Sequence, residues 1–477
     1  DGATKAEVLF QGFVLQHNLP FVMNDSFKKL VARMFPDSDI AKRYACGHTK
    51  ASHLIHCIGK ESIDKVRKEL TRLWRREEKK WYSLSIDGSS DNDDKYLPIL
   101  VTCEDSEGLI GTQFLNVPTV NYANAKNIAE TVEKCLSTSA TAAFVSDNAS
   151  VMIGKHRGVF KLFQEKQSGG EIYGAGCACH LAAKQGANAL SFDPQDFLVD
   201  VFYHFDKSAK WKEMLREDIS FHNETIRKVP KHVSTRWLSM SHTLERVLEI
   251  WDGLRCYFLT HYDDDTDEPG PSKCQKTNGG GDESINKLYV LFLHAIISRF
   301  DTFNMLLQHE DPMIHRLQPA MMKLYQELLG CLIKPSVIIK NKDDLLAIDV
   351  TAEDLQKSNT DLFIGFSASQ MIRKQDLEES CEVDRFLAEV RGFYQKALVY
   401  TKQKFPLKDS ILKAVVVFDP ENRVKSNLSM IETLLEKFPN AIPENRTNEL
   451  FMEFMLYQTC TDLLTFSPQE DRIDKFW

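Results

Sequence analysis

The sequence has no uninterrupted apolar run of the roughly 18 residues that a membrane-spanning helix needs. Its longest apolar run, LYVLFLHAII at residues 288–297, predicts a buried helix instead. No signal peptide is recognisable at the start. The first residue is Asp1 rather than Met, which predicts a fragment of a longer protein. The sequence therefore predicts no membrane partner.

Several common catalytic motifs are also missing. The chain shows no Ser-His-Asp order, no Gly-rich phosphate loop and no EF-hand pattern, which argues against the enzyme and calcium-binding classes that carry them. Its 11 cysteines in 477 residues are scattered and odd in number. That usage is typical of reduced thiols in an intracellular compartment.

The chain carries no overall excess of positive charge. The net charge of −9 taken alone argues against a nucleic-acid binder. However, residues 41–80 hold 12 Lys and Arg against five Asp and Glu. This stretch either forms a solvated helix face with internal ion pairs or contacts a phosphate backbone as a cluster.

The periodicity predicts a mixed α/β protein. Apolar residues recur at three- and four-residue steps through residues 1–80, including Phe10, Phe13 and Val14, then Phe27, Leu30, Val31 and Met34, which indicates helices. The pattern then changes to period two. Five strands are expected, at residues 82–86, 96–103, 109–117, 141–147 and 172–177. Helices at 124–136 and 151–167 separate the later strands, and GSSDNDD at 88–94 is expected to be a turn.

Beyond about residue 195 the strand signal disappears and helical segments dominate. One stretch, residues 263–282, is rich in acidic residues, Gly and Pro and predicts a disordered loop. Three regions are therefore expected: an N-terminal helical and basic region (1–80), an α/β core (81–195) and a helical domain (196–477).

Two aspartates end apolar runs about sixty residues apart. Asp87 ends WYSLSID and Asp147 ends TAAFVSD. Most such residues cap a turn or the next helix. If the two strands are neighbours, however, the carboxylates form a site for Mg²⁺, which takes a few carboxylate oxygens and keeps other positions for water or phosphate. Small residues follow each aspartate and leave room for an anionic ligand.

Two further motifs are candidates for binding. CACH, from Cys177 to His180, follows the fifth strand, but it lacks the four ligands of a structural zinc site. STRW, residues 234–237, opens a helix. Arg236 could bind a phosphate and Trp237 could stack on an extruded base, although a core tryptophan beside a surface arginine explains the same pattern.

Taken together, four segments resemble the catalytic region of hAT-superfamily DNA transposases, including the domesticated hAT-like proteins of animal genomes. They are, in order, SLSIDGSSDNDDKYLPILV, VSDNASVMIGKHRGV, GCACHLAAKQGA and KHVSTRWLSM. The resemblance covers residues 80–260 well and the helices from residue 284 onward more loosely.

The resemblance implies a ribonuclease-H-like mixed five-stranded sheet interrupted by a large all-α insertion and preceded by an N-terminal helical region. In that family an Asp-Asp-Glu triad binds two divalent metals, Mg²⁺ or Mn²⁺. The first two acids correspond to Asp87 and Asp147. The Cys-x-x-His motif corresponds to Cys177 and His180, and the Arg-Trp pair that handles the flipped base corresponds to Arg236 and Trp237. The implied partner is DNA, either transposon ends or chromatin, and the implied location is the nucleus.

The chain departs from the family pattern in two respects. The third acid, a Glu beyond the helical insertion, is not found, and we expect it to lie beyond Trp477. The family's N-terminal zinc finger and most of its dimerising C-terminal region are also not found. A homo-oligomer is therefore expected to form through a C-terminal region that this chain lacks.

Three functions follow as hypotheses. The first is a metal-dependent transposase core for DNA strand cleavage and transfer, incomplete without its third acid. The second is a domesticated, catalytically inactive descendant that binds DNA, chromatin or protein as a nuclear scaffold. The third is an unrelated ribonuclease-H-like nuclease that acts on RNA.

Overall fold

The structure is a computed structural model that describes the chain in segments. The described residues are 2–477 except 76–81, 92, 105–109, 137–140, 148, 155, 167–171, 178, 226–237, 262–282, 310, 375–379, 440, 461–472 and 474–477. The chain divides into two compact units, Asp1–Gly176 and Cys177–Trp477. The predicted loop at 263–282 lies outside the described residues.

The first unit begins with helices, as the three- and four-residue periodicity predicts. They are α1 (Gly2–Gln16), α2 (Met23–Met34), α3 (Asp39–Arg43) and α4 (His48–Arg75). Ser38 caps α3 by accepting a hydrogen bond from the Ala41 amide. The long helix α4 contacts α1 and α2, and it also contacts β5 (Ile110–Asn116). Val66 and Leu70 of α4 are buried in the same hydrophobic cluster as the sheet.

The rest of the first unit is built on a five-stranded mixed sheet in the order β5-β4-β1-β6-β7. The remaining strands of this sheet are β1 (Tyr82–Ile86), β4 (Ile99–Glu104), β6 (Thr141–Asp147) and β7 (Tyr173–Cys177). β1 pairs antiparallel with β4 on one side and parallel with β6 on the other. The five predicted strands are thereby confirmed, and so is the mixed α/β class.

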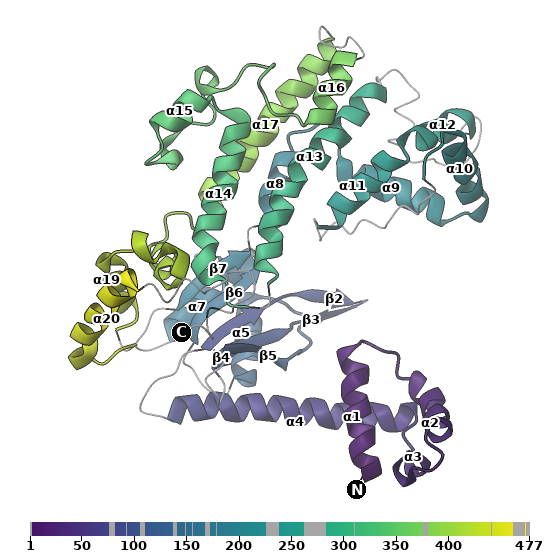
Figure 1. Ribbon diagram of the computed structural model, residues 1–477, viewed down its shortest axis with the longest axis vertical. Helices are drawn as coiled ribbons and strands as arrows, with labels where there is room; N and C mark the ends of the chain where they lie inside the picture. The colour runs from purple at the N-terminus through teal and green to yellow at the C-terminus, as the bar shows by residue number, and fades with distance from the viewer. Residues whose placement is uncertain are drawn as a thin grey trace. The chain divides into compact units, whose positions relative to one another are not determined.

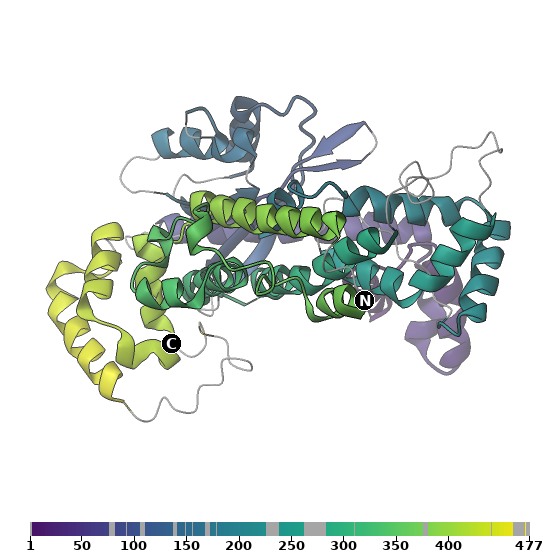
Figure 2. The ribbon, with the colours of Figure 1, turned by 90° about the horizontal axis from the view of Figure 1, so that it is seen from above.

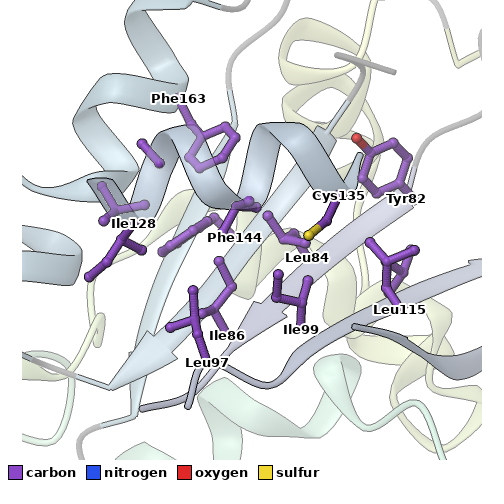
Figure 3. Close-up of a cluster of buried hydrophobic side chains, with 14 of the residues drawn as sticks. Tyr82, Leu84, Ile86, Leu97, Ile99, Leu115, Ile128, Cys135, Phe144 and Phe163 are labelled. Atoms are coloured by element: carbon purple, nitrogen blue, oxygen red, sulfur yellow. The ribbon is translucent and has the colours of Figure 1, made fainter. Parts of the chain in front are cut away.

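One face of the sheet holds the core of this unit. Alternate residues of β1, namely Tyr82, Leu84 and Ile86, are buried, as period two requires. Figure 3 shows them beside Phe144 of β6 and residues of α5 (Ala125–Cys135) and α7 (Val159–Lys166). The intervening residues Ser83 and Ser85 are only half-buried. The sheet therefore has one apolar and one more polar face.

Two predictions in this unit were wrong. The expected turn at 88–94 instead forms a ribbon of two short strands, β2 (Ser89–Asp91) and β3 (Asp94–Tyr96). The expected helix at 151–167 is divided into α6 (Ser150–Ile153) and α7. Gly154 and Gly158 lie at the break, where a Cβ on Gly158 would stand 2.4 Å from the Gly154 nitrogen. The two glycines let the backbone approach itself where a helix would otherwise continue.

The second unit is mainly helical in its described residues, which also include an isolated β-bridge between Ile333 and Gln356. Its α-helices are α8 (Cys179–Ala187), α9 (Pro194–Asp206), α10 (Ala209–Phe221), α11 (Leu238–Glu249), α12 (Trp251–His261), α13 (Glu283–Leu307), α14 (Ile314–Leu332), α15 (Pro335–Lys340), α16 (Phe366–Lys374), α17 (Cys381–Lys404), α18 (Ser410–Ala414), α19 (Leu428–Lys437) and α20 (Thr447–Thr459). Short 3-10 turns join them, including Val415–Phe418 and Pro420–Lys425. The long helices α13, α14 and α17 contact one another, and Figures 1 and 2 show them at the centre of this unit.

Helix α13 carries the apolar run noted in the sequence. Its segment Ile285–Leu307 is long and apolar enough to cross a membrane by length and composition, and within the described ranges it alone meets that test. Counting uninterrupted apolar residues missed it because polar residues interrupt the run. Leu288, Val290 and Leu293 are fully buried within the unit. The prediction that residues 288–297 form a buried helix is thus confirmed.

Candidate functional site

The two aspartates singled out in the sequence belong to neighbouring parallel strands. Ser85 of β1 pairs with Val145 of β6, so Asp87 and Asp147 lie two residues further along each strand at matching register positions. Adjacent strands are about 4.8 Å apart, and the carboxyl ends of parallel strands meet at one edge of the sheet. The topology therefore brings both residues to the same edge, next to each other.

Asp87 is exposed and its backbone is fixed. Its amide donates a hydrogen bond to the carbonyl of Pro98, at 3.3 Å, which holds the end of β1 against the adjoining strand segment. Its Oδ1 accepts a hydrogen bond from the Gly88 amide at 2.9 Å. Among the described residues no other hydrogen bond to this carboxylate is formed. The second oxygen, Oδ2, is therefore available to a ligand.

Asp147 is the last residue of β6, and its side chain lies outside the described part of the structure. The strand that carries it is well anchored. Phe144 is fully buried and Ser146 is almost so, while Val145 between them is partly exposed. Phe144 packs against Phe163 of α7 with ring centroids 5.9 Å apart. The core contacts of β6 thus fix the backbone that delivers Asp147 to the edge.

The ribbon β2–β3 follows directly after Asp87 and is held by one asparagine. Asn121, in the segment before α5, accepts from the Lys95 amide at 2.9 Å and donates to Asp94 Oδ1 at 2.9 Å. The Val120 amide also donates to the Lys95 carbonyl at 2.7 Å. Sequence reasoning missed Asn121, since no local pattern pairs it with a ribbon 25 residues earlier. Residues 89–96 contain no Asn-Gly or Asp-Gly pair that would have signalled a hairpin.

Two carboxylates at one edge are donors that suit a divalent cation. Mg²⁺ is commonly held by one or two carboxylates, with water and substrate phosphate completing its shell. Among the described side chains, which do not include that of Asp147, no group of three or more His, Cys, Asp or Glu could hold a metal ion.

For the other predicted site residues, the structure describes either the backbone only or nothing. Cys177 ends β7 and His180 is the second residue of α8, so CACH spans a strand-to-helix junction as predicted; the side chains of both lie outside the description. Arg236 and Trp237 lie outside the described residues altogether. Helix α11 is described from the next residue, Leu238, and the predicted helix opening at STRW lies outside the described residues.

The basic stretch at 41–80 has two roles within α4. Val66 and Leu70 are buried against the sheet. Lys60, Lys65 and Lys68, in contrast, are exposed. The helix therefore packs with one face and presents lysines on another. Both sequence interpretations of this stretch are compatible with that arrangement.

The chain was compared with protein-family models and with curated proteins, and neither comparison gave a match.

Proposed function

We propose that this chain is a hAT-like transposase core of ribonuclease-H-like type, acting on DNA phosphodiesters through one divalent cation held by Asp87 and Asp147. The single observation that supports the proposal is the parallel β1–β6 pair, whose register brings both aspartates to adjacent positions at one sheet edge. The strand one–strand four pair implied by the resemblance has this same arrangement.

Each residue has a definite task under this proposal. Asp87 offers Oδ2 to the cation while the Gly88 amide holds Oδ1. Asp147 supplies the facing carboxylate. When bound, Mg²⁺ or Mn²⁺ polarises a phosphodiester and activates the attacking water or 3′-hydroxyl. The exposed lysines of α4 attract the DNA backbone. Following the resemblance, Arg236 and Trp237 bind the extruded end, with Cys177 and His180 beside the strand-to-helix junction.

A second function, a catalytically inactive nuclear scaffold for DNA, chromatin or protein, is favoured by a different observation. The Glu segment that carries the family's third acid does not occur in this sequence. Because catalysis by a two-metal site depends on correct ligand geometry, a site with two protein ligands can bind a cation without cleaving DNA.

Binding of Mn²⁺, followed by electron paramagnetic resonance of the free ion, tests the site directly. Asp87→Asn and Asp147→Asn should each weaken binding by roughly tenfold or more, because an amide is a poor substitute for a carboxylate ligand. Asp93→Asn is the matched control, since this exposed residue lies at the ribbon's tip and carries the same charge. If all three variants lost the same Mn²⁺ affinity, the loss would follow from the change in net charge alone, and the proposed site would be rejected.

Nicking of a DNA hairpin in the presence of Mg²⁺ or Mn²⁺ then separates the two functions. Cleavage that disappears in both site variants but persists in Asp93→Asn supports the transposase core. Metal binding without cleavage in a full-length protein supports the scaffold. A preference for RNA hybrids over DNA hairpins would instead indicate a nuclease of another kind.

A further inference from the structure

Helices α1 and α2 share an exposed apolar surface. Leu9 and Phe13 of α1 are 65% and 48% exposed, and Leu30 and Met34 of α2 are 51% and 57% exposed. These four residues are called the α1–α2 face. The half-buried Phe10 links its two halves, with ring centroids 6.1 Å from Phe13 and 3.6 Å from Phe27. Exposed apolar residues gathered on two helices that such a ring contact joins are typical of an interaction surface.

The edge of this face is basic. Lys29 and Arg33 are exposed, one helical turn apart, and each directly precedes an apolar member of the face in sequence. The acidic residue of α2, Asp25, is already engaged: its Oδ2 lies 2.7 Å from His48 Nδ1, and its Oδ1 accepts from the His48 amide. The α1–α2 face therefore has an excess of positive charge along one side.

Helix α20 has the complementary surface. It buries Phe454 against Val417 and Ile431. On its other side Met452, Met455 and Leu456 are exposed, and these residues are called the α20 face. Glu449 and Glu453, also exposed and one turn apart, border this face. Glu449 pairs with Arg446 at 2.9 Å, but both side chains are more than 60% exposed, so this pair contributes little and can be exchanged.

We propose that the α1–α2 face binds the α20 face of a second copy of this chain. Each face pairs apolar residues one turn apart with charges one turn apart, and the charges are opposite in sign. Helices that pack along an apolar seam select partners through such flanking charges. Both halves of the contact are present in one polypeptide, so a second copy supplies all that either face requires.

In the expected assembly the α1–α2 face of one copy contacts the α20 face of another. A helix-on-helix contact of this kind falls short of the roughly 1,000 Å² of a stable interface. The dimer should therefore be weak, with a dissociation constant in the micromolar range, and weaker at high salt because the flanking charges are exposed. This contact uses no catalytic residue and is independent of the proposed function.

Sedimentation velocity of the chain over a concentration series tests the proposal. The variant Lys29→Glu/Arg33→Glu should weaken self-association by roughly tenfold or more, and so should Glu449→Lys/Glu453→Lys. Combining all four substitutions in one chain should restore it, because each face then again meets the opposite charge. Lys340→Glu/Lys342→Glu, on two exposed lysines at the end of α15, is the control and should leave association unchanged.

Each outcome of these measurements either supports or overturns the proposed contact. Loss in both charge variants with recovery in the combined one establishes the contact. A monomer at every concentration in the unaltered chain overturns it, and so does a concentration-independent docking of α20 within one chain. Circular dichroism of every variant checks that the helices persist, and Leu30→Ser with Leu456→Ser gives a second route that changes no charge.

Discussion

Helices α1 and α17 bury opposite kinds of residue. The inner face of α17 is apolar and aromatic, with Val390, Phe393 and Tyr394 fully buried. The inner face of α1, in contrast, includes Glu7 and Gln11, which are 2% and 0% exposed, while its Leu9 faces solvent. Helix α17 thus buries its apolar residues in the core of its own unit, whereas α1 leaves several of its apolar residues exposed.

Hydrogen bonds make this arrangement of α1 stable. Glu7 Oε1 accepts from the Ala45 amide at 2.9 Å and Glu7 Oε2 pairs with Lys50 at 2.6 Å. Gln11 Nε2 donates to Asn24 Oδ1 at 2.9 Å. Buried polar groups are tolerated when they are paired in this way. Helix α1 is thus positioned mainly by buried hydrogen bonds and an ion pair, and α17 by apolar packing.

The largest effect should come from removing packing in α17. Phe393 lies edge-on to Phe292, with ring centroids 5.2 Å apart, and it fills the space above Gly186, where a Cβ would stand 2.8 Å from its ring. Phe393→Ala should cost about 3–5 kcal/mol of unfolding free energy because a cavity remains. Urea denaturation measures this, with exposed Phe366→Ala as the control. A cost below 1 kcal/mol would mean that α17 is not held by packing.

The second effect concerns a buried polar group in the helical unit. Burial lowers the pKa of His204 from its ordinary value of 6.5 to about 4, aided by the nearby Lys207 charge. The unfolded chain therefore binds a proton before the folded one does. Stability should be intact above pH 6.5, fall by up to about 3 kcal/mol as the pH drops to 4, and lose nothing further from this group below that.

The variant His204→Phe isolates this contribution. Its ring can still stack on Trp211, whose centroid lies 4.5 Å from the imidazole, but it cannot titrate. Unfolding free energies measured from pH 7.5 to pH 4 should decline less steeply in the variant than in the unaltered chain. Parallel curves would show that the imidazole titrates normally and that the pairing with Tyr257, at 3.0 Å, does not keep it neutral.

The third effect tests the polar packing of α1. Glu7→Ala removes the acceptor of the Ala45 amide and should cost about 1–3 kcal/mol, since a buried donor loses its partner. Lys50→Ala should cost less, because its side chain is 47% exposed and water can replace part of the pair. Thermal unfolding compares the two. Equal losses would assign the effect to the ion pair rather than to the backbone bond.

The smallest effect should come from the apolar side of α1. Leu9→Ser and Phe13→Ser should each change the unfolding free energy by about 0.5 kcal/mol or less, as most surface substitutions do. The measurement is made at low protein concentration, where self-association is negligible. A loss of 2 kcal/mol or more would show that these residues belong to the core of the first unit, and the contrast with α17 would disappear.

The sequence predicted a structural feature well where that feature depends on residues close together in the chain. Period two located β1 and β4 because their alternate residues are buried. The three- and four-residue periodicity located helix α1, but it did not reveal that Glu7 and Gln11 are its buried residues, because their partners lie at Asn24, Ala45 and Lys50. Polar residues selected by distant partners leave no periodic trace in the sequence.

For the candidate site, the sequence identified the two aspartates, but it could not show that they lie next to each other in the fold. That relation depends on β1 and β6 pairing across the 54 residues between them, which the register establishes. The ribbon beside Asp87 escaped prediction because a run of Ser, Asp and Asn is typical of a turn, and its strands are stabilised by Asn121 rather than by apolar residues.

The two hydrogen bonds of Asn121, one to Lys95 and one to Asp94, have a mechanical consequence. Asn121 stands just before α5, whose Ile128 and Val132 are embedded in the sheet's core. A displacement of the ribbon is therefore expected to act on α5, whose buried residues pack in the core. A ligand that contacts the ribbon is therefore expected to shift the adjoining end of β1, where Asp87 lies.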